Sequence, residues 1–171
     1  MKIKVTDRNK DFLKNLSRSA TEMQGRKLRV GVMDDGDLGM IAHVHEYGCD
    51  IRVTPKMRAY LSAAKGIHLK ASTTVIRIPE RSFIRAGFDK HEGGWRRKVG
   101  QLIRQSIEGN GTIPVDTLLD MFGLELSGKI QEFARDLSSP PNSPATVKLK
   151  GSSNPLADTG RLIGAIKHEL E

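Results

Sequence analysis

One stretch of the chain, from Val115 to Leu137, has the apolar spacing of a long amphipathic helix. A helix with such a continuous apolar stripe has to bury it against another layer of the protein. We therefore expect this segment to form the main helical layer of the fold. The stripe consists of Val115, Leu118, Leu119, Phe122, Leu126, Ile130, Phe133 and Leu137.

Other segments have the patterns of strands and shorter helices. Alternating apolar residues predict strands at residues 1–5, 28–32, 73–78 and 166–170. Helical spacing predicts helices at 7–25, 38–47, 79–108 and 158–166, with an interruption of the third at Gly93-Gly94. Together these elements predict an α+β fold, in which a small, mainly antiparallel sheet packs on one side against two or three helices.

The chain length fits a single domain, because 171 residues lie within the usual range of roughly 100–200. Two segments depart from regular patterns. Residues 55–72 have only a weak helical period after Pro55 and predict a mobile insertion. Residues 138–157 are rich in proline, serine and asparagine and predict an extended, proline-rich arm.

Charge, hydropathy and cysteine content narrow the classes of protein. The net charge of +8 suits a polyanionic partner such as DNA, but the basic residues are spread out and no aromatic stacking platform accompanies them.

No apolar run approaches the roughly 18 residues of a membrane span, and the first residues do not lead into a signal peptide. We expect a cytoplasmic protein. Cys49, the only cysteine, excludes an internal disulfide.

Two patterns resemble cofactor sites but lack an essential part. Residues 123–129 match most of a phosphate-binding loop, yet Ile130 stands where a hydroxyl must reach magnesium, and the segment lies within the predicted long helix. His43, His45, Glu46 and Cys49 resemble metal ligands, but His43 and His45 would point about 200° apart on a helix. We expect neither a cofactor nor a bound metal.

A third pattern, Asp158-Thr159-Gly160, resembles the triplet of aspartic proteases. Only about a dozen residues follow it, too few to build the sheet that would enclose a substrate. Asp158 or Thr159 is better explained as the cap of a final helix. No other arrangement of nucleophile and base is evident, so we expect the protein not to be an enzyme.

Three short motifs carry a resemblance to a known family. Their order and spacing are similar to those in the tail-component and virion-morphogenesis proteins of long-tailed bacteriophages, over about residues 28–171. The motifs are Ala42-His43-Val44-His45-Glu46-Tyr47-Gly48, Ile78-Pro79-Glu80-Arg81-Ser82-Phe83-Ile84-Arg85 and Asn154-Pro155-Leu156-Ala157-Asp158-Thr159-Gly160-Arg161-Leu162.

The resemblance implies a structural, non-enzymatic subunit of the neck or tail end, which makes the tail competent to join the filled head. It implies a ring of six copies in the virion, made in the host cytoplasm. The implied partners are further copies of the chain, head-tail connector or adaptor proteins, and tail terminator and tail tube proteins. Non-specific contact with phage DNA in the lumen would suit the basic charge. The insertion at 55–72 departs from shorter members of the family.

Candidate residues for contact between subunits lie in the insertion, in the arm and at its end. They are Met57, Tyr60, Leu61, Pro140, Pro141, Pro144, Asp158, Thr159 and Arg161. Alternatives remain open at this point: a tail terminator or minor tail protein, a basic nucleic-acid-binding module, and, more remotely, a hydrolase built on the histidine cluster.

Overall fold

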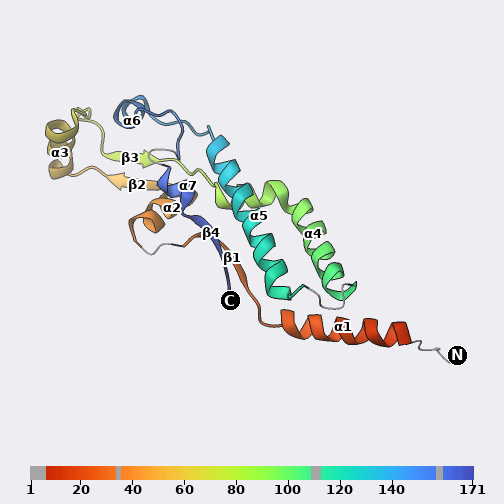
Figure 1. Cartoon of the computed structure of the whole chain (residues 1–171). Coiled ribbons are helices and arrows are strands. Elements are labelled where there is room, and N and C mark those ends of the chain that lie inside the picture. The colour runs from red at the N-terminus through yellow and green to blue at the C-terminus, as the bar shows by residue number, and fades with distance from the viewer. Residues whose placement is uncertain (1–6, 34–35, 109–112, 157–159) are drawn as a thin grey trace. The chain divides into compact units, whose positions relative to one another are not determined.

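The computed structural model describes residues 7–33, 36–108, 113–156 and 160–171 (Figure 1). The α+β class is confirmed, since helices make up most of this part of the chain and its short strands pair as antiparallel ladders. Contacts divide the chain into two compact units. The first contains Met1–Gly31, Phe88–Gly128 and Lys167–Glu171, and the second contains Val32–Gly87 and Lys129–Ile166.

The first unit has a core between two helices. Its elements are α1 (Asp7–Met23), most of β1 (Leu28–Val32), most of α4 (Ile84–Glu108), the first part of α5 (Val115–Asp136) and most of β4 (Ile166–Leu170). Trp95 of α4 meets Phe122 of α5 edge to face, with ring centroids 5.9 Å apart. Leu102 of α4 and Val115 and Leu118 of α5 are buried as well. The amphipathic period of residues 115–137 thus produces the expected helical layer.

Gly123 of α5 lies close to the β1–β4 ladder. A Cβ atom at this position would lie 2.5 Å from the ring of His168 and 2.8 Å from Leu28, so only glycine fits. Next to this contact, His168 Nε2 lies 2.8 Å from Asp120 Oδ1. Lys27 and Glu171 exchange backbone hydrogen bonds of 2.7 and 2.8 Å at the end of the ladder.

The second unit contains the other ladder, in which β2 (Cys49–Arg52) pairs antiparallel with β3 (Val75–Ile78). Along both strands, half-buried apolar residues alternate with exposed residues that are mostly charged. Asp50 of β2 and Arg77 of β3 form an exposed ion pair across the ladder. Gly48, with φ +74°, turns the chain from α2 (Asp37–Tyr47) into β2. A side chain there would meet the backbone of Glu80 at 2.9 Å.

A helix, α3 (Pro55–Lys65), connects β2 to β3. Thr54 caps its start by accepting a hydrogen bond from the backbone of Met57, and Gly66 ends it in the left-handed conformation. The guanidinium of Arg58 then donates to three carbonyl groups of the following loop. These belong to Leu69, Lys70 and Thr73, at 2.9, 2.8 and 2.8 Å.

The prediction of one sheet is wrong for the described strands. Residues 28–32 pair with 166–170, whereas 75–78 pair with β2, which the sequence analysis did not predict. Strand pairing is a non-local choice, and the alternation of single segments does not encode it. The strand predicted at residues 1–5 lies outside the described residues.

Several predicted helix limits also need correction. Helix α4 begins at Ile84, five residues after Pro79, and continues through Gly93 and Gly94 without a break. Both glycines are exposed, and each costs a helix only about 1 kcal/mol relative to alanine. The last helix is a single turn, α7 (Arg161–Gly164).

The predicted extended arm contains a helix, α6 (Pro144–Lys150). Ser143 caps it by accepting a hydrogen bond from the backbone of Thr146, Pro144 occupies the first turn, and Gly151 ends it in the left-handed conformation. The same residue types that break a helix in its interior favour its two ends.

Helix α1 forms where predicted, but much of its apolar face is not core. Phe12 and Leu13 are 48% and 55% exposed, and Leu16 is also exposed.

Among the residues that the structure describes, no helix combines the length and apolar character needed to cross a bilayer.

Candidate functional site

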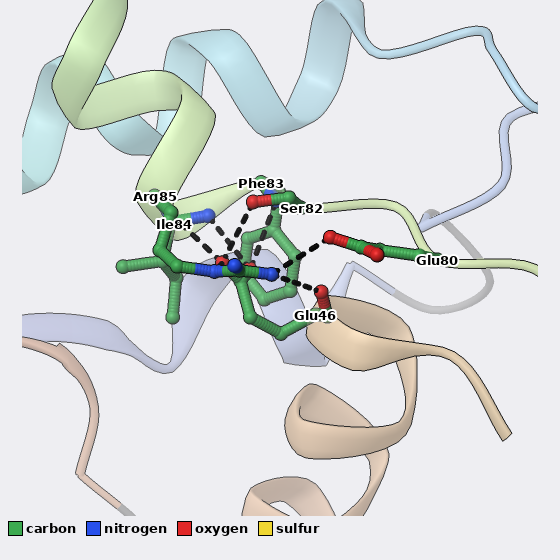
Figure 2. Close-up of polar contacts among 6 residues, drawn as sticks. All are labelled: Glu46, Glu80, Ser82, Phe83, Ile84 and Arg85. Atoms are coloured by element: carbon green, nitrogen blue, oxygen red, sulfur yellow. Dashed lines mark hydrogen bonds and ion pairs between the residues drawn. The ribbon is translucent and has the colours of Figure 1, made fainter.

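Glu46, in the last turn of α2, has a buried carboxylate that accepts five hydrogen bonds (Figure 2). Its Oε2 accepts from the backbone N–H groups of Phe83 and Ile84, both at 2.9 Å. Its Oε1 accepts from the Ser82 hydroxyl at 2.9 Å and from the backbone and Nε of Arg85, both at 3.0 Å. Helix α4 is therefore capped by a side chain from another helix.

The environment of Glu46 keeps the carboxylate charged. Burial alone would raise its pKa, but hydrogen bonds from the backbone of Ile84 and Arg85 and from the side chains of Ser82 and Arg85 outweigh this effect and lower the pKa. The negative charge also faces the positive end of the α4 dipole. Removing one partner of a buried charge is costly even where the charge adds little net stability.

Arg85 extends the hydrogen-bond network of Glu46 towards the surface. Its Nη2 donates to the backbone carbonyl of Glu46 at 2.9 Å and to the carboxylate of Glu80 at 2.8 Å (Figure 2). Its guanidinium also lies 4.6 Å from the ring centroid of Tyr47. Hydrogen bonds to Glu46 raise the pKa of Arg85.

Arg81 connects the end of α2 to the proline-rich segment. Its buried guanidinium donates from Nε to the carbonyl of Pro140 at 2.8 Å and from Nη2 to that of Pro141 at 3.1 Å. The side chain of Asn142 is a third acceptor, at 3.3 Å. Burial lowers the pKa of Arg81. The predicted arm therefore docks onto its own chain at its start.

His45 completes this cluster in the neutral state. Its backbone carbonyl accepts from the backbone N–H of Arg81 at 2.7 Å, and its Nδ1 lies 3.3 Å from Arg81 Nη1. Burial, followed by the charges of Arg81 and Lys150, lowers the pKa of His45 to about 4. Because a guanidinium can only donate, Nδ1 accepts and the ring proton lies on Nε2.

The third motif lies against α2 as well. Asn154 donates to the carbonyl of Arg135 at 2.6 Å and accepts from the backbone of Leu156 at 2.8 Å. Pro155 and Leu156 are buried, and α7 packs against α2. A pocket of about 300 Å³ lies between α2, the end of α6 and the segment that enters α7.

The predicted contact residues are in different places. Met57 and Leu61 are half-buried on α3 and Tyr60 is exposed there, while Arg161 is exposed at the start of α7. Pro140 and Pro141 are half-buried and exposed, respectively, beside Arg81, and Pro144 is exposed in α6. Asp158 and Thr159 lie outside the described residues. The contacts predicted between subunits stay predictions.

The patterns that resembled cofactor sites have structural roles. Residues 123–129 lie within α5, as expected. His43 stacks on Tyr47 with ring centroids 4.7 Å apart, while His45 contacts Arg81. Within the described ranges, no three acidic, histidine or cysteine side chains are grouped so that they could hold a metal ion.

Sequence reasoning missed Glu46, Arg81 and Arg85 as the residues that join the motifs. The available signal was the presence of charged residues inside short motifs at helix boundaries.

No protein-family model, curated protein or solved structure matches the chain.

Proposed function

We propose that the chain is a structural subunit of a tailed bacteriophage, active in tail completion or head-to-tail joining at the neck. The observation that supports this most is the meeting of all three motifs of the resemblance at the end of α2. Glu46 and His45 bind the second motif, and Leu156 and Leu162 of the third line a pocket with His45. Chance similarity of three short motifs gives no reason for them to pack together.

The ring arrangement is part of the same proposal. A ring subunit needs two different surfaces that fit each other on neighbouring copies. Exposed apolar side chains on separate elements, such as Phe12 of α1 and Tyr60 of α3, are suitable for such surfaces. We propose a homohexamer in the virion that contacts connector or adaptor proteins on the head side and tail terminator and tail tube proteins on the tail side.

Imaging of phage lysates tests the role directly. Lysates of a phage that lacks this protein should contain full heads beside unattached tails in negative stain, and the protein supplied in trans should restore joined particles. The mass of the purified protein in solution should reach six times the 18.9 kDa of the chain. Normal virions without the protein would contradict the proposal.

A nucleic-acid-binding module is the second candidate, favoured by the exposed face of α4. Arg97 and Arg104 lie two turns apart on this face and make no ion pair with any described residue. Binding through several phosphate contacts would give an affinity that falls steeply with salt. A gel-shift titration at increasing salt separates the candidates, because a neck subunit needs only weak contact with DNA.

A further inference from the structure

The pocket beside α2 is lined by both apolar and polar side chains among the residues that the structure describes. Ile41 of α2, Leu156 and Leu162 contribute to the wall. The polar side chains among the described lining residues are His45, Lys150 and Arg161, which we call the rim, and none of the described lining residues carries a carboxylate. A ligand that fits both parts must combine an apolar group with a hydrogen-bond acceptor.

Each of the three rim side chains presents N–H groups. His45 carries its proton on Nε2, because its Nδ1 is held by Arg81. Lys150 Nζ donates to the carbonyl groups of Asn154 and Pro155, at 3.5 and 3.3 Å. Arg161 is exposed, and its guanidinium makes no ion pair within the described part of the chain.

The charge of the rim favours an anion over a neutral acceptor. Arg81 Nη1 lies 3.3 Å from His45 Nδ1, and Lys150 and Arg161 line the pocket, so cationic groups surround His45 at this end. Hydrogen bonds from charged donors to a carboxylate are about twice as strong as neutral ones. The guanidinium of Arg161 can bind both oxygens of a carboxylate at once.

We propose that this pocket binds a carboxylate carried on a small branched apolar group, with the apolar group against Ile41 and Leu162 and the carboxylate at Arg161 and His45. The volume of about 300 Å³ is at the lower limit of ligand pockets and suits a single residue or a short acid. Two sources share this chemistry: the C-terminal residue of a partner chain that ends in leucine or isoleucine, and a free short-chain acid. Neither source requires the chain to be a virion subunit.

Titration of the full chain, followed by amide resonances in NMR spectra, tests the site. The probes are acetyl-Gly-Gly-Leu with a free carboxylate, the same peptide with a C-terminal amide, and 4-methylpentanoate. The free-acid peptide should shift resonances of residues 38–45 and 160–162 in a saturable way, and the amide should bind at least about fivefold more weakly. Tighter binding of 4-methylpentanoate than of the peptide would assign the pocket to free acids, and the reverse would assign it to a chain terminus.

Two variants and a matched control complete the experiment. Arg161→Gln should weaken binding of both acids about threefold to fivefold and leave the amide unchanged, because an exposed ion pair contributes modestly. Ile41→Ala should weaken all three probes. Arg97→Gln removes an exposed arginine outside the pocket and should change nothing. Equal affinity for acid and amide, no saturable shift with either acid, or undiminished acid binding by Arg161→Gln would each overturn the assignment.

Discussion

The carboxylate of Glu46 lies 2.9 Å from the backbone nitrogen of Phe83, so a side chain at the end of α2 closes the start of α4. The first N–H groups of a helix have no partner inside the helix and need one from elsewhere. Here the partner comes from 37 residues earlier in the chain. The start of α4 is therefore tied to the end of α2 by hydrogen bonds to one side chain.

Glu46→Ala should reduce the free energy of unfolding by about 3–5 kcal/mol, because it removes the acceptor for several buried donors at once. Urea unfolding followed by circular dichroism measures this change. Asp50→Ala is the matched control: it breaks an exposed ion pair with Arg77, which water and salt screen, and should change the free energy of unfolding far less. Similar losses for the two variants would contradict the capping role of Glu46.

Acidification from pH 7 to 5 should destabilise the protein through His45. Its folded pKa of about 4 lies below the ordinary value of 6.5, so the unfolded chain binds the proton first and stability falls as the pH drops through this window. We expect a loss of about 1–2 kcal/mol, after allowing for partial exposure of the ring.

Urea unfolding at several pH values measures this dependence. His45→Asn, whose side-chain oxygen can still accept from Arg81, should show a flatter profile above pH 5. The lowered pKa of Glu46 acts at lower pH, because its contribution is present above the ordinary value of 4.5 and is lost below it. An identical profile for wild type and His45→Asn would refute the assignment to His45.

Gly123→Ala should destabilise the protein by about 2–4 kcal/mol, because the new methyl group would overlap the side chains of His168 and Leu28. Gly128→Ala is the matched control on the same helix, since nothing lies within 4 Å of a Cβ there. This control should stabilise the protein by about 0.5–1 kcal/mol, through its higher helix propensity. Thermal unfolding compares the two, and equal effects would refute the close packing of α5.

Arg81→Gln should release the proline-rich segment from α2. Amide hydrogen exchange in residues 142–156 should accelerate about tenfold or more, because the carbonyl groups of Pro140 and Pro141 lose their donor. Arg77→Gln removes an exposed arginine from the same unit and should leave this exchange unchanged. Unaltered exchange in Arg81→Gln would show that the segment is held by other contacts.

Tyr60→Ser should reduce the size of the proposed assembly without loss of the fold, because Tyr60 is 57% exposed on α3. Light scattering coupled to size exclusion gives the assembly mass, and circular dichroism reports the fold. Leu124→Ser, at a residue that is 66% exposed on α5, serves as the control for loss of an exposed apolar side chain. A wild-type mass for Tyr60→Ser would remove α3 from the proposed interface.

The sequence predicted the elements whose signal is local. The stripe from Val115 to Leu137 and the alternation of residues 28–32 and 166–170 depend only on neighbouring residues, and all three formed as expected. The prolines of residues 138–157 do not predict helix α6, because proline breaks a helix in its interior; in the structure Pro144 lies in the first turn, with Ser143 before it and Gly151 at the other end.

The candidate site was less predictable because its partners are backbone atoms. Glu46 binds N–H groups and Arg81 binds carbonyl groups, and every residue type except proline offers both. Side-chain identity in the sequence therefore does not show which backbone groups meet.

The segment between β2 and β3 supplies hydrogen-bond partners for its own backbone groups. Thr54 accepts at the start of α3, Gly66 donates at its end, and Arg58 donates to carbonyl groups of the following loop. Because these contacts stay within the segment, we expect its removal or exchange to leave the Cys49–Ile78 and Arg52–Val75 register of the ladder in place. We expect related chains to vary most in length here. The same property makes it a suitable position for inserting an epitope or fluorescent tag.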